Sequence, residues 1–168
     1  MNKKLKLYVI SGCCGAGKST LANELVKQMS KTALIHGDII DDLYPEGSAP
    51  WEERLQLAWE SILLLADNFL RRQINVIVDY VVEEELPRLL ALAKKYNAKV
   101  WYVVMTAGEA VLRERLRARG DALLIERALF LRQKLMGAEH NKPYLYDGTG
   151  VPIEQQVRDV KNFKAYPA

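Results

Sequence analysis

A glycine-rich stretch near the start of the chain constrains the fold more than any other feature. Residues 11–20 read Ser-Gly-Cys-Cys-Gly-Ala-Gly-Lys-Ser-Thr. The apolar run 5–10 that precedes them is typical of a buried strand, and apolar residues recur at helical spacing from Lys18 to Met29. A strand, a glycine loop and a helix in this order predict a turn whose backbone N–H groups and helix N-terminus face an anion.

The stretch matches the P-loop pattern in full. Gly12 and Gly17 are separated by four residues, and Lys18 and Ser19 follow. In this motif the lysine reaches the β and γ phosphates of a nucleotide, and the hydroxyl ligates Mg²⁺. We therefore expect Lys18 to act in catalysis and the whole loop to bind nucleotide phosphates: Gly12, Cys13, Cys14, Gly15, Ala16, Gly17, Lys18, Ser19 and Thr20.

The only two cysteines of the chain, Cys13 and Cys14, lie inside this loop. Adjacent cysteines, with only His36 and His140 as histidines, match no common zinc spacing and form no C-x-x-C pair. Small side chains tolerated in the loop are therefore favoured over a redox or metal centre. A thiol beside a helix N-terminus and a lysine can have a lowered pKa, so sensitivity to oxidation stays open.

Short apolar runs alternate with helical patterns along the rest of the chain. The runs predict strands at residues 33–36, 74–78, 100–105 and 144–146. The helical patterns cover residues 52–72, 83–95, 107–119, 123–137 and 153–163. This alternation predicts an α/β fold with a parallel sheet covered on both faces. Because the 168 residues contain no linker or repeat, we expect one domain over residues 1–168.

Composition excludes several classes of protein. Apolar residues make up 49% and charged residues 27% of the chain, as in soluble globular proteins. The net charge of +3 comes from 24 basic and 21 acidic residues scattered along the chain, so a nucleic-acid partner is not expected. No run is long enough for a secretory signal or a membrane span. We expect a cytoplasmic monomer or homodimer without a membrane partner.

Two large groups of nucleotide hydrolases are disfavoured by local sequence. The third predicted strand ends at Asp79 and is followed by Tyr80, where many ATPases carry a glutamate that polarises water. The guanine-recognition pattern Asn-Lys-x-Asp has one candidate, which begins at Asn141 but has Tyr144 in the place of the aspartate. A hydrolytic ATPase and a GTPase are therefore both unlikely matches to this chain.

The loop and the element order resemble the compact P-loop kinases of the gluconate kinase and shikimate kinase kind. The chain is also similar to chloramphenicol phosphotransferase-like and tunicamycin-resistance-like proteins. The resemblance implies a P-loop NTPase three-layer sandwich with a five-stranded parallel sheet in the order 2-3-1-4-5 and a short helical lid over about residues 119–137. It also implies ATP and Mg²⁺ as cofactors and a kinase that moves the γ-phosphate to a hydroxyl of a small molecule.

The resemblance also suggests residues for the acceptor side. Asp38, after the second strand, is the candidate base, with a helix cap as the alternative role. Asp41 is expected to bind the acceptor or face solvent, and Arg54 is a candidate contact of the acceptor. Asp79, at the carboxyl end of the third strand, is assigned to Mg²⁺ or the acceptor, with a structural hydrogen bond as the alternative.

Arginines in the predicted lid resemble those that contact ATP in these kinases. Arg115 and Arg119 are four residues apart and share a helix face, so we expect them to bind ATP and assist catalysis. A solvated basic helix face is the alternative. Arg127 resembles the returning arginine of the lid and is assigned to the substrate.

The identity of the acceptor stays open at this point. The segment from Asp38 to Glu60 lacks the residues that follow Gly-Asp in sugar-acid kinases, so gluconate is not expected. The nearest enzymatic alternative is a nucleoside or polynucleotide 5′-hydroxyl kinase. A non-catalytic ATP-binding switch module is the alternative from a different class.

Overall fold

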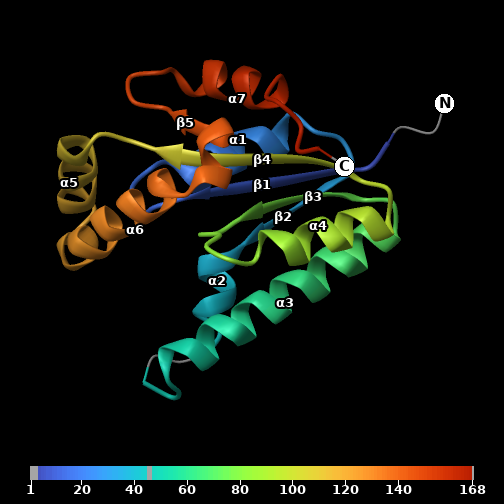
Figure 1. Cartoon of the computed structure of the whole chain (residues 1–168), viewed down its shortest axis with the longest axis horizontal. Helices are drawn as coiled ribbons and strands as arrows, with labels where there is room; N and C mark the ends of the chain where they lie inside the picture. Colours follow the sequence, from blue (N-terminus) through green and yellow to red (C-terminus); the bar gives the residue numbers. More distant parts are fainter. Residues whose placement is uncertain (1–3, 45–46, 168) are drawn as a thin grey trace.

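The computed structural model describes residues 4–44 and 47–167, and in it a parallel sheet lies between two layers of helices (Figure 1). The strands lie in the order β2-β3-β1-β4-β5, and every neighbouring pair is parallel. The five strands are β1 (Lys6–Gly12), β2 (Thr32–His36), β3 (Asn75–Asp79), β4 (Lys99–Thr106) and β5 (Leu145–Asp147). The expected three-layer α/β fold and its strand order are thereby confirmed.

Helices connect the strands and follow the predicted pattern closely. The α-helices are α1 (Lys18–Lys27), α2 (Gly37–Asp41), α3 (Trp51–Arg71), α4 (Leu86–Lys95), α5 (Glu109–Ala118), α6 (Ile125–Gly137) and α7 (Ile153–Lys161). Two 3₁₀ helices, η1 (Ala122–Leu124) and η2 (Glu139–Tyr144), flank α6. The sequence did not predict α2 or η2, because each is short and carries no clear periodicity.

Three helices begin later than their sequence patterns predict: α5 and α6 by two residues each, and α4 by three. The pattern places the start at Glu83, but α4 begins at Leu86. The side chain of Glu85 accepts hydrogen bonds from the backbone N–H groups of Glu83 and Glu84, at 2.9 and 3.0 Å. These bonds hold the preceding residues in a turn, so the helix starts after it.

Alternation along β1 divides the core into two layers. Leu7 and Val9 are fully buried against the layer that holds α3 and α4. Tyr8 and Ile10 point to the opposite face and pack with residues of α1 and α7. Figure 1 shows α7 and α1 on one side of the sheet and α3 and α4 on the other. Because successive side chains of a strand point to opposite faces of the sheet, one buried strand contributes to both halves of the core.

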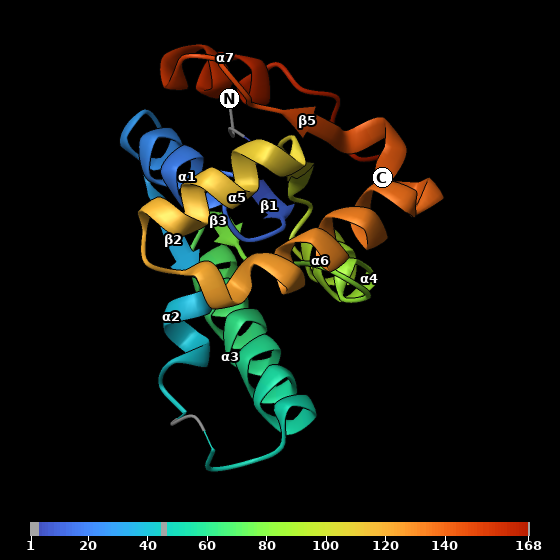
Figure 2. The ribbon, with the colours of Figure 1, turned by 90° about the vertical axis from the view of Figure 1, so that its left-hand side faces the viewer.

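The carboxyl ends of the strands gather the segments that carry the sequence motifs. Viewed from that end, α5 and α6 lie in front of β1, and α2 and the start of α3 lie below them (Figure 2). Ligands of open parallel sheets bind at this edge, where the loops after successive strands meet. Among the described residues, no helix is both long and apolar enough to span a membrane.

Candidate functional site

The glycine loop between β1 and α1 has the backbone geometry of a phosphate cradle. Gly12 has φ 139°, and a Cβ there would overlap the carbonyl oxygen of Met105 on β4. Gly17 has φ 102° and is the N-cap of α1, which begins at Lys18. Only glycine adopts these conformations without strain. The first N–H groups of α1 have no partners inside the helix and are therefore available to an anion.

Lys18 is buried at the base of this loop. Its exposed fraction is 7%, and its Nζ donates a hydrogen bond to the Cys13 carbonyl at 3.2 Å. The same carbonyl accepts the backbone N–H of Ala16 at 3.3 Å. The lysine therefore closes the loop on itself, and an anion in the cradle would compete with the carbonyl for its ammonium group.

The two cysteines pack as small apolar side chains. Cys13 is buried in the core between β1, α1 and α5, and Cys14 packs against Leu116 and Ile125 beside the lid helices. Burial raises the pKa of the Cys13 thiol, and this effect outweighs the opposing charge of Lys18. The sequence left open a lowered pKa for these thiols, and for Cys13 that prediction is wrong.

One pocket joins the glycine loop to the segments after β2 and α5. Its volume is about 140 Å³. Lys18, Ser19 and Thr20 line it from the loop, Asp38 from α2, and Arg119 from the end of α5. Leu124 of η1 completes its wall. The structure therefore brings together the loop, the candidate base and one of the two lid arginines.

Asp38 reaches this pocket because α2 starts directly after β2. A Cβ at Gly37 would overlap the ring of Tyr80, so the close approach of α2 to the end of β3 requires glycine. Asp38 lies in the first turn of α2 and makes no capping hydrogen bond. Removal from water raises the pKa of its carboxyl group; Lys18 opposes the shift, and nearby aspartates add to it. The residue as a whole is exposed, so water screens these charges.

Asp79 forms a structural hydrogen bond, the role that the sequence left as the alternative, and its partner is His36. His36 and Asp79 are register partners at the ends of β2 and β3, and His36 Nδ1 lies 2.7 Å from Asp79 Oδ2. Because a carboxylate can only accept, the imidazole N–H donates. The other oxygen, Oδ1, is buried without a hydrogen-bond partner. The sequence predicted both strand ends but gave no sign that these two side chains meet.

Asp41 and Arg54 face each other across α2 and α3. Arg54 Nη2 lies 3.5 Å from Asp41 Oδ2, and both side chains are largely buried. Asp41 Oδ1 and Arg54 Nε have no partners, and the guanidinium lies 6.0 Å from the Trp51 ring centroid. Asp41 therefore does not face solvent.

The lid arginines have three different environments. Arg115 donates from Nη1 to the Gly15 carbonyl at 3.1 Å, which ties α5 to the glycine loop. Arg119 lines the pocket, is exposed and makes no ion pair within the described part of the chain. Arg127 lies 3.2 Å from Glu83, which also binds Lys134 at 2.5 Å. Arg127 therefore contacts the loop after β3 rather than the lining of the pocket.

Comparison with known proteins gives the family. Residues 7–152 match AAA_33, a family described as an AAA domain. The chain belongs to this family. The match spans the glycine loop, the acceptor-side helices and the lid, so the AAA domain contains nearly every residue discussed above. Nucleotide binding by the glycine loop follows from this P-loop fold.

Solved structures similar to this AAA domain include several kinases and related proteins. The Deinococcus radiodurans tunicamycin resistance protein is 18% identical with a TM-score of 0.64, covering 98% of this chain and 100% of that one. A gluconokinase from Sinorhizobium meliloti 1021 is 17% identical with a TM-score of 0.59, covering 94% and 91%. A protein of the Pnkp1/Rnl/Hen1 RNA repair complex is 16% identical with a TM-score of 0.65. The match covers 98% of this chain and 48% of that protein. The resemblance to compact P-loop kinases is thereby confirmed.

Proposed function

We propose that this AAA domain is an ATP-dependent kinase that transfers the γ-phosphate of ATP to a hydroxyl group of an uncharged small molecule. The observation that carries the proposal is the shared pocket: a carboxylate on α2 faces the same space as the lysine and hydroxyls of the glycine loop. A hydrolase needs a residue that positions water, whereas a kinase needs a group that receives the proton of a hydroxyl.

The glycine loop would hold the nucleotide. Its N–H groups and the N-terminus of α1 would bind the phosphate chain, and Lys18 would exchange its bond to the Cys13 carbonyl for phosphate oxygens. Arg119 would bring a further positive charge to the transferred group, and Arg115 would keep α5 against the loop through Gly15. Arg127 would join the site only after leaving Glu83.

Two oxygen groups suit a magnesium ion that accompanies the nucleotide. Ser19 lines the pocket, and Asp79, which is outside the lining, keeps one buried carboxylate oxygen without a partner. Mg²⁺ prefers one or two such ligands together with phosphates and water. When bound, the ion would neutralise charge on the phosphates. The Nδ1–H of His36 would keep the Asp79 carboxylate oriented through its other oxygen.

Asp38 would receive the proton of the acceptor hydroxyl. Its raised pKa makes it a stronger base than an ordinary aspartate. The loose transition state of phosphoryl transfer requires positioning more than basicity, and Asp38 is placed by the packing of Gly37 on Tyr80.

Charges around Asp38 support an uncharged acceptor. Asp41, Asp42 and Asp79 are near enough to raise its pKa. Lys18 opposes them from the glycine loop, where it would bind the nucleotide, and Arg54 is already paired with Asp41. An acceptor with a carboxylate or phosphate next to its hydroxyl would be repelled by these charges. A neutral polyol would instead offer hydroxyl groups to both members of the Asp41–Arg54 pair.

The experiment measures ADP release from Mg·ATP with a matched pair of acceptors, sorbitol and gluconate, which share a six-carbon polyol chain and differ in charge. We expect a neutral acceptor from a wider panel of polyols, nucleosides and hydroxylated antibiotics to stimulate release at least about tenfold more than its acidic analogue. Lys18→Ala should lower the stimulated rate by about 10²–10³-fold, and Asp38→Asn by a similar factor.

Asp42→Asn is the matched control, because it removes the same charge from an exposed neighbour at the end of α2. Retention of the acceptor-dependent rate in Asp38→Asn would overturn the role of Asp38. Stimulation by a 5′-hydroxyl oligonucleotide would favour the polynucleotide alternative, to which the similarity with the RNA repair protein points. ATP binding without turnover across the whole panel would favour a switch module.

A further inference from the structure

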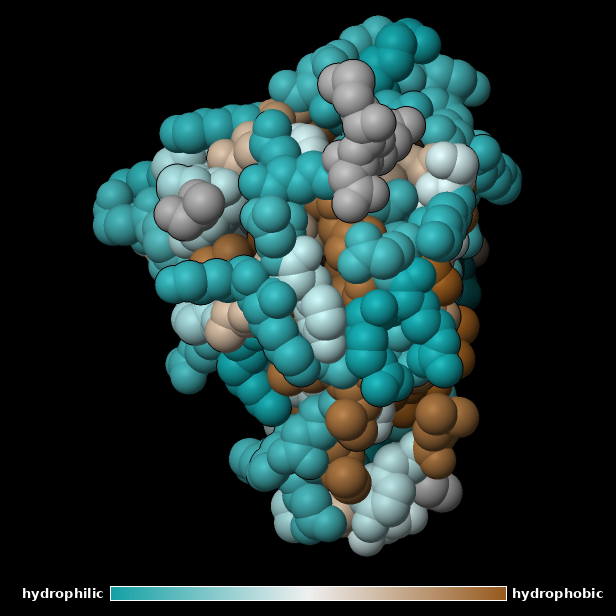
Figure 3. Space-filling model, turned by 90° about the vertical axis from the view of Figure 1, so that its right-hand side faces the viewer, coloured by the Kyte–Doolittle hydropathy of each residue, from teal (hydrophilic) through white to brown (hydrophobic). Residues whose placement is uncertain are grey.

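A second hollow lies at the amino end of the sheet, far from the glycine loop. This end of the molecule faces the viewer in Figure 3, where mostly hydrophilic residues with apolar ones between them cover the surface. The hollow has a volume of about 670 Å³. Its walls come from the start of β1, the turn between α1 and β2, the residues before and at the start of β3, and the end of α7.

The lining of this hollow carries charge of one sign. It contains four lysines and no acidic residue: Lys4, Lys6, Lys31 and Lys161. Over residues 4–44 and 47–167, none of the four forms an ion pair with a carboxylate. Elsewhere on the surface, Lys27, Lys95, Lys134 and Lys142 each lie within 2.7 Å of an acid. Lys6 Nζ lies 5.4 Å from the Trp101 ring centroid, but no carboxylate of the described residues balances the charge of the four lysines.

Helix dipoles explain only one of these lysines. In a parallel α/β fold the helices end at the amino edge of the sheet, and cations there stabilise the last carbonyl groups. Lys161 lies in the last turn of α7 and fits this explanation. Lys4 precedes β1, Lys6 lies within it and Lys31 lies in the turn before β2, so none of these belongs to a helix end.

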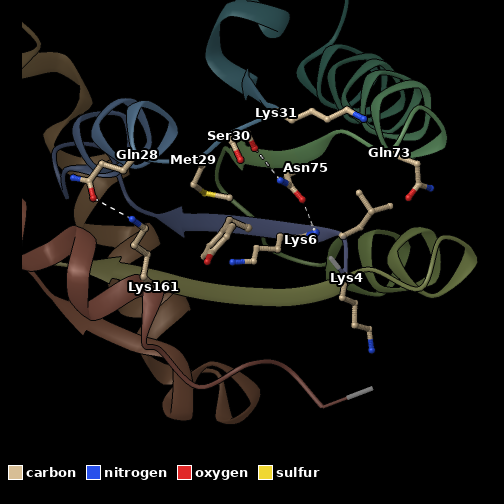
Figure 4. Close-up of a pocket in the computed structure, with 11 residues that line it drawn as sticks. Lys4, Lys6, Gln28, Met29, Ser30, Lys31, Gln73, Asn75 and Lys161 are labelled. Carbon is tan, nitrogen blue, oxygen red and sulfur yellow. Dashed lines mark hydrogen bonds between the residues drawn. The ribbon is translucent and has the colours of Figure 1, made fainter. Parts of the chain in front are cut away.

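Hydrogen bonds hold the walls of the hollow in place (Figure 4). Lys161 Nζ donates to Gln28 Oε1 at 3.1 Å, which joins α7 to the end of α1. Asn75 accepts the backbone N–H of Lys6 at 3.0 Å and donates to the Ser30 carbonyl at 3.2 Å. In Figure 4, Lys31 lies at the top of the view and Lys4 at the lower right, and their ammonium groups point away from each other. The backbone positions of the lysines are thus defined before any ligand binds.

We propose that this hollow binds a small anion that carries two or three linked phosphate groups. Ammonium groups repel one another when they line one concavity, and an oxyanion between them removes this repulsion. The volume lies in the range of small-molecule sites, which favours a compact polyphosphate over a longer chain. The site is separate from the glycine loop, and the proposal does not depend on the kinase activity.

The test measures binding of inorganic tripolyphosphate by isothermal titration calorimetry. Because the glycine loop also binds phosphates, the titration uses the Lys18→Ala protein as its background. We expect binding at one remaining site, weakened at least about tenfold by Lys31→Glu with Lys161→Glu. The control pair Arg88→Glu with Lys94→Glu makes the same change in net charge on exposed residues of α4, and it should alter the affinity by less than about threefold.

Three outcomes would overturn the proposal. The first is an unchanged affinity in the Lys31 and Lys161 variant. The second is an equal loss in the α4 control, which would mean diffuse attraction by net charge. The third is tighter binding of a single-stranded oligonucleotide through the same two lysines, which would make the surface a nucleic-acid contact. Circular dichroism verifies folding, and Lys31→Gln with Lys161→Gln replaces the first pair if it does not fold.

Discussion

The loops after β1 and after β2 meet in one pocket, but they are built in different ways. The loop after β1 is specified by adjacent residues: glycines, a lysine and hydroxyls within residues 12–20. The segment after β2 is specified by partners from elsewhere: Gly37 packs on Tyr80, His36 on Asp79, and Asp41 on Arg54. A local motif specifies the first loop, whereas contacts with residues distant in the sequence position the second.

The largest effect should follow from Gly12→Ala in the first loop. A Cβ would overlap a backbone carbonyl, and φ would remain in a region that alanine avoids, so we expect a loss of about 3–4 kcal/mol in the free energy of unfolding. Urea denaturation measures this loss, and titration with ATP should show loss of nucleotide binding. The exposed Gly47, also at positive φ but with no atom near its would-be Cβ, is the control. A folded, ATP-binding variant would show that the loop is less constrained than its geometry indicates.

Gly37→Ala tests the second loop with the same substitution. The new Cβ would overlap a side chain, which can shift, so we expect a smaller loss of about 2–3 kcal/mol. ATP should still bind, while the KM for the acceptor rises. If nucleotide binding falls as much as in Gly12→Ala, the segment after β2 also determines nucleotide binding, and the two loops do not act independently.

His36→Ala tests the partnership between strand ends. It would leave both oxygens of a carboxylate that is 3% exposed without hydrogen bonds, at a cost of about 1–2 kcal/mol. His36→Asn retains a donor and should recover part of the loss. Equal stability of the wild type and His36→Ala in urea denaturation would mean that the hydrogen bond contributes nothing.

Among these variants, Asp38→Asn should change the free energy of unfolding least, and the size of the change depends on pH. The raised pKa of Asp38 means that folding favours its protonated form, so its stabilising contribution is full below the unfolded pKa and is lost as pH rises through the folded pKa. Asparagine does not titrate. The variant should therefore gain stability relative to the wild type as pH rises from about 3 to about 7, by no more than about 1 kcal/mol. Thermal unfolding at both pH values measures this; a relative loss at the higher pH would contradict the sign.

The sequence by itself determined the glycine loop, the alternation of strands and helices, and the place of Asp79 at the end of a strand. These depend on neighbouring residues, because a strand, a helix and a P-loop each have a short repeat or a contiguous motif. The strand order came from the resemblance that the motif supported, and the structure agrees with it.

Only the tertiary structure decided which of these residues meet. His36 and Asp79 are 43 positions apart, and their hydrogen bond exists because β2 and β3 are neighbours that end at the same level. Arg127 turns toward Glu83 because α6 passes the loop after β3, and the lysines at the amino end of the sheet gather from segments near both chain ends. Contacts of this kind depend on how whole elements pack against one another, and no short stretch of sequence encodes that packing.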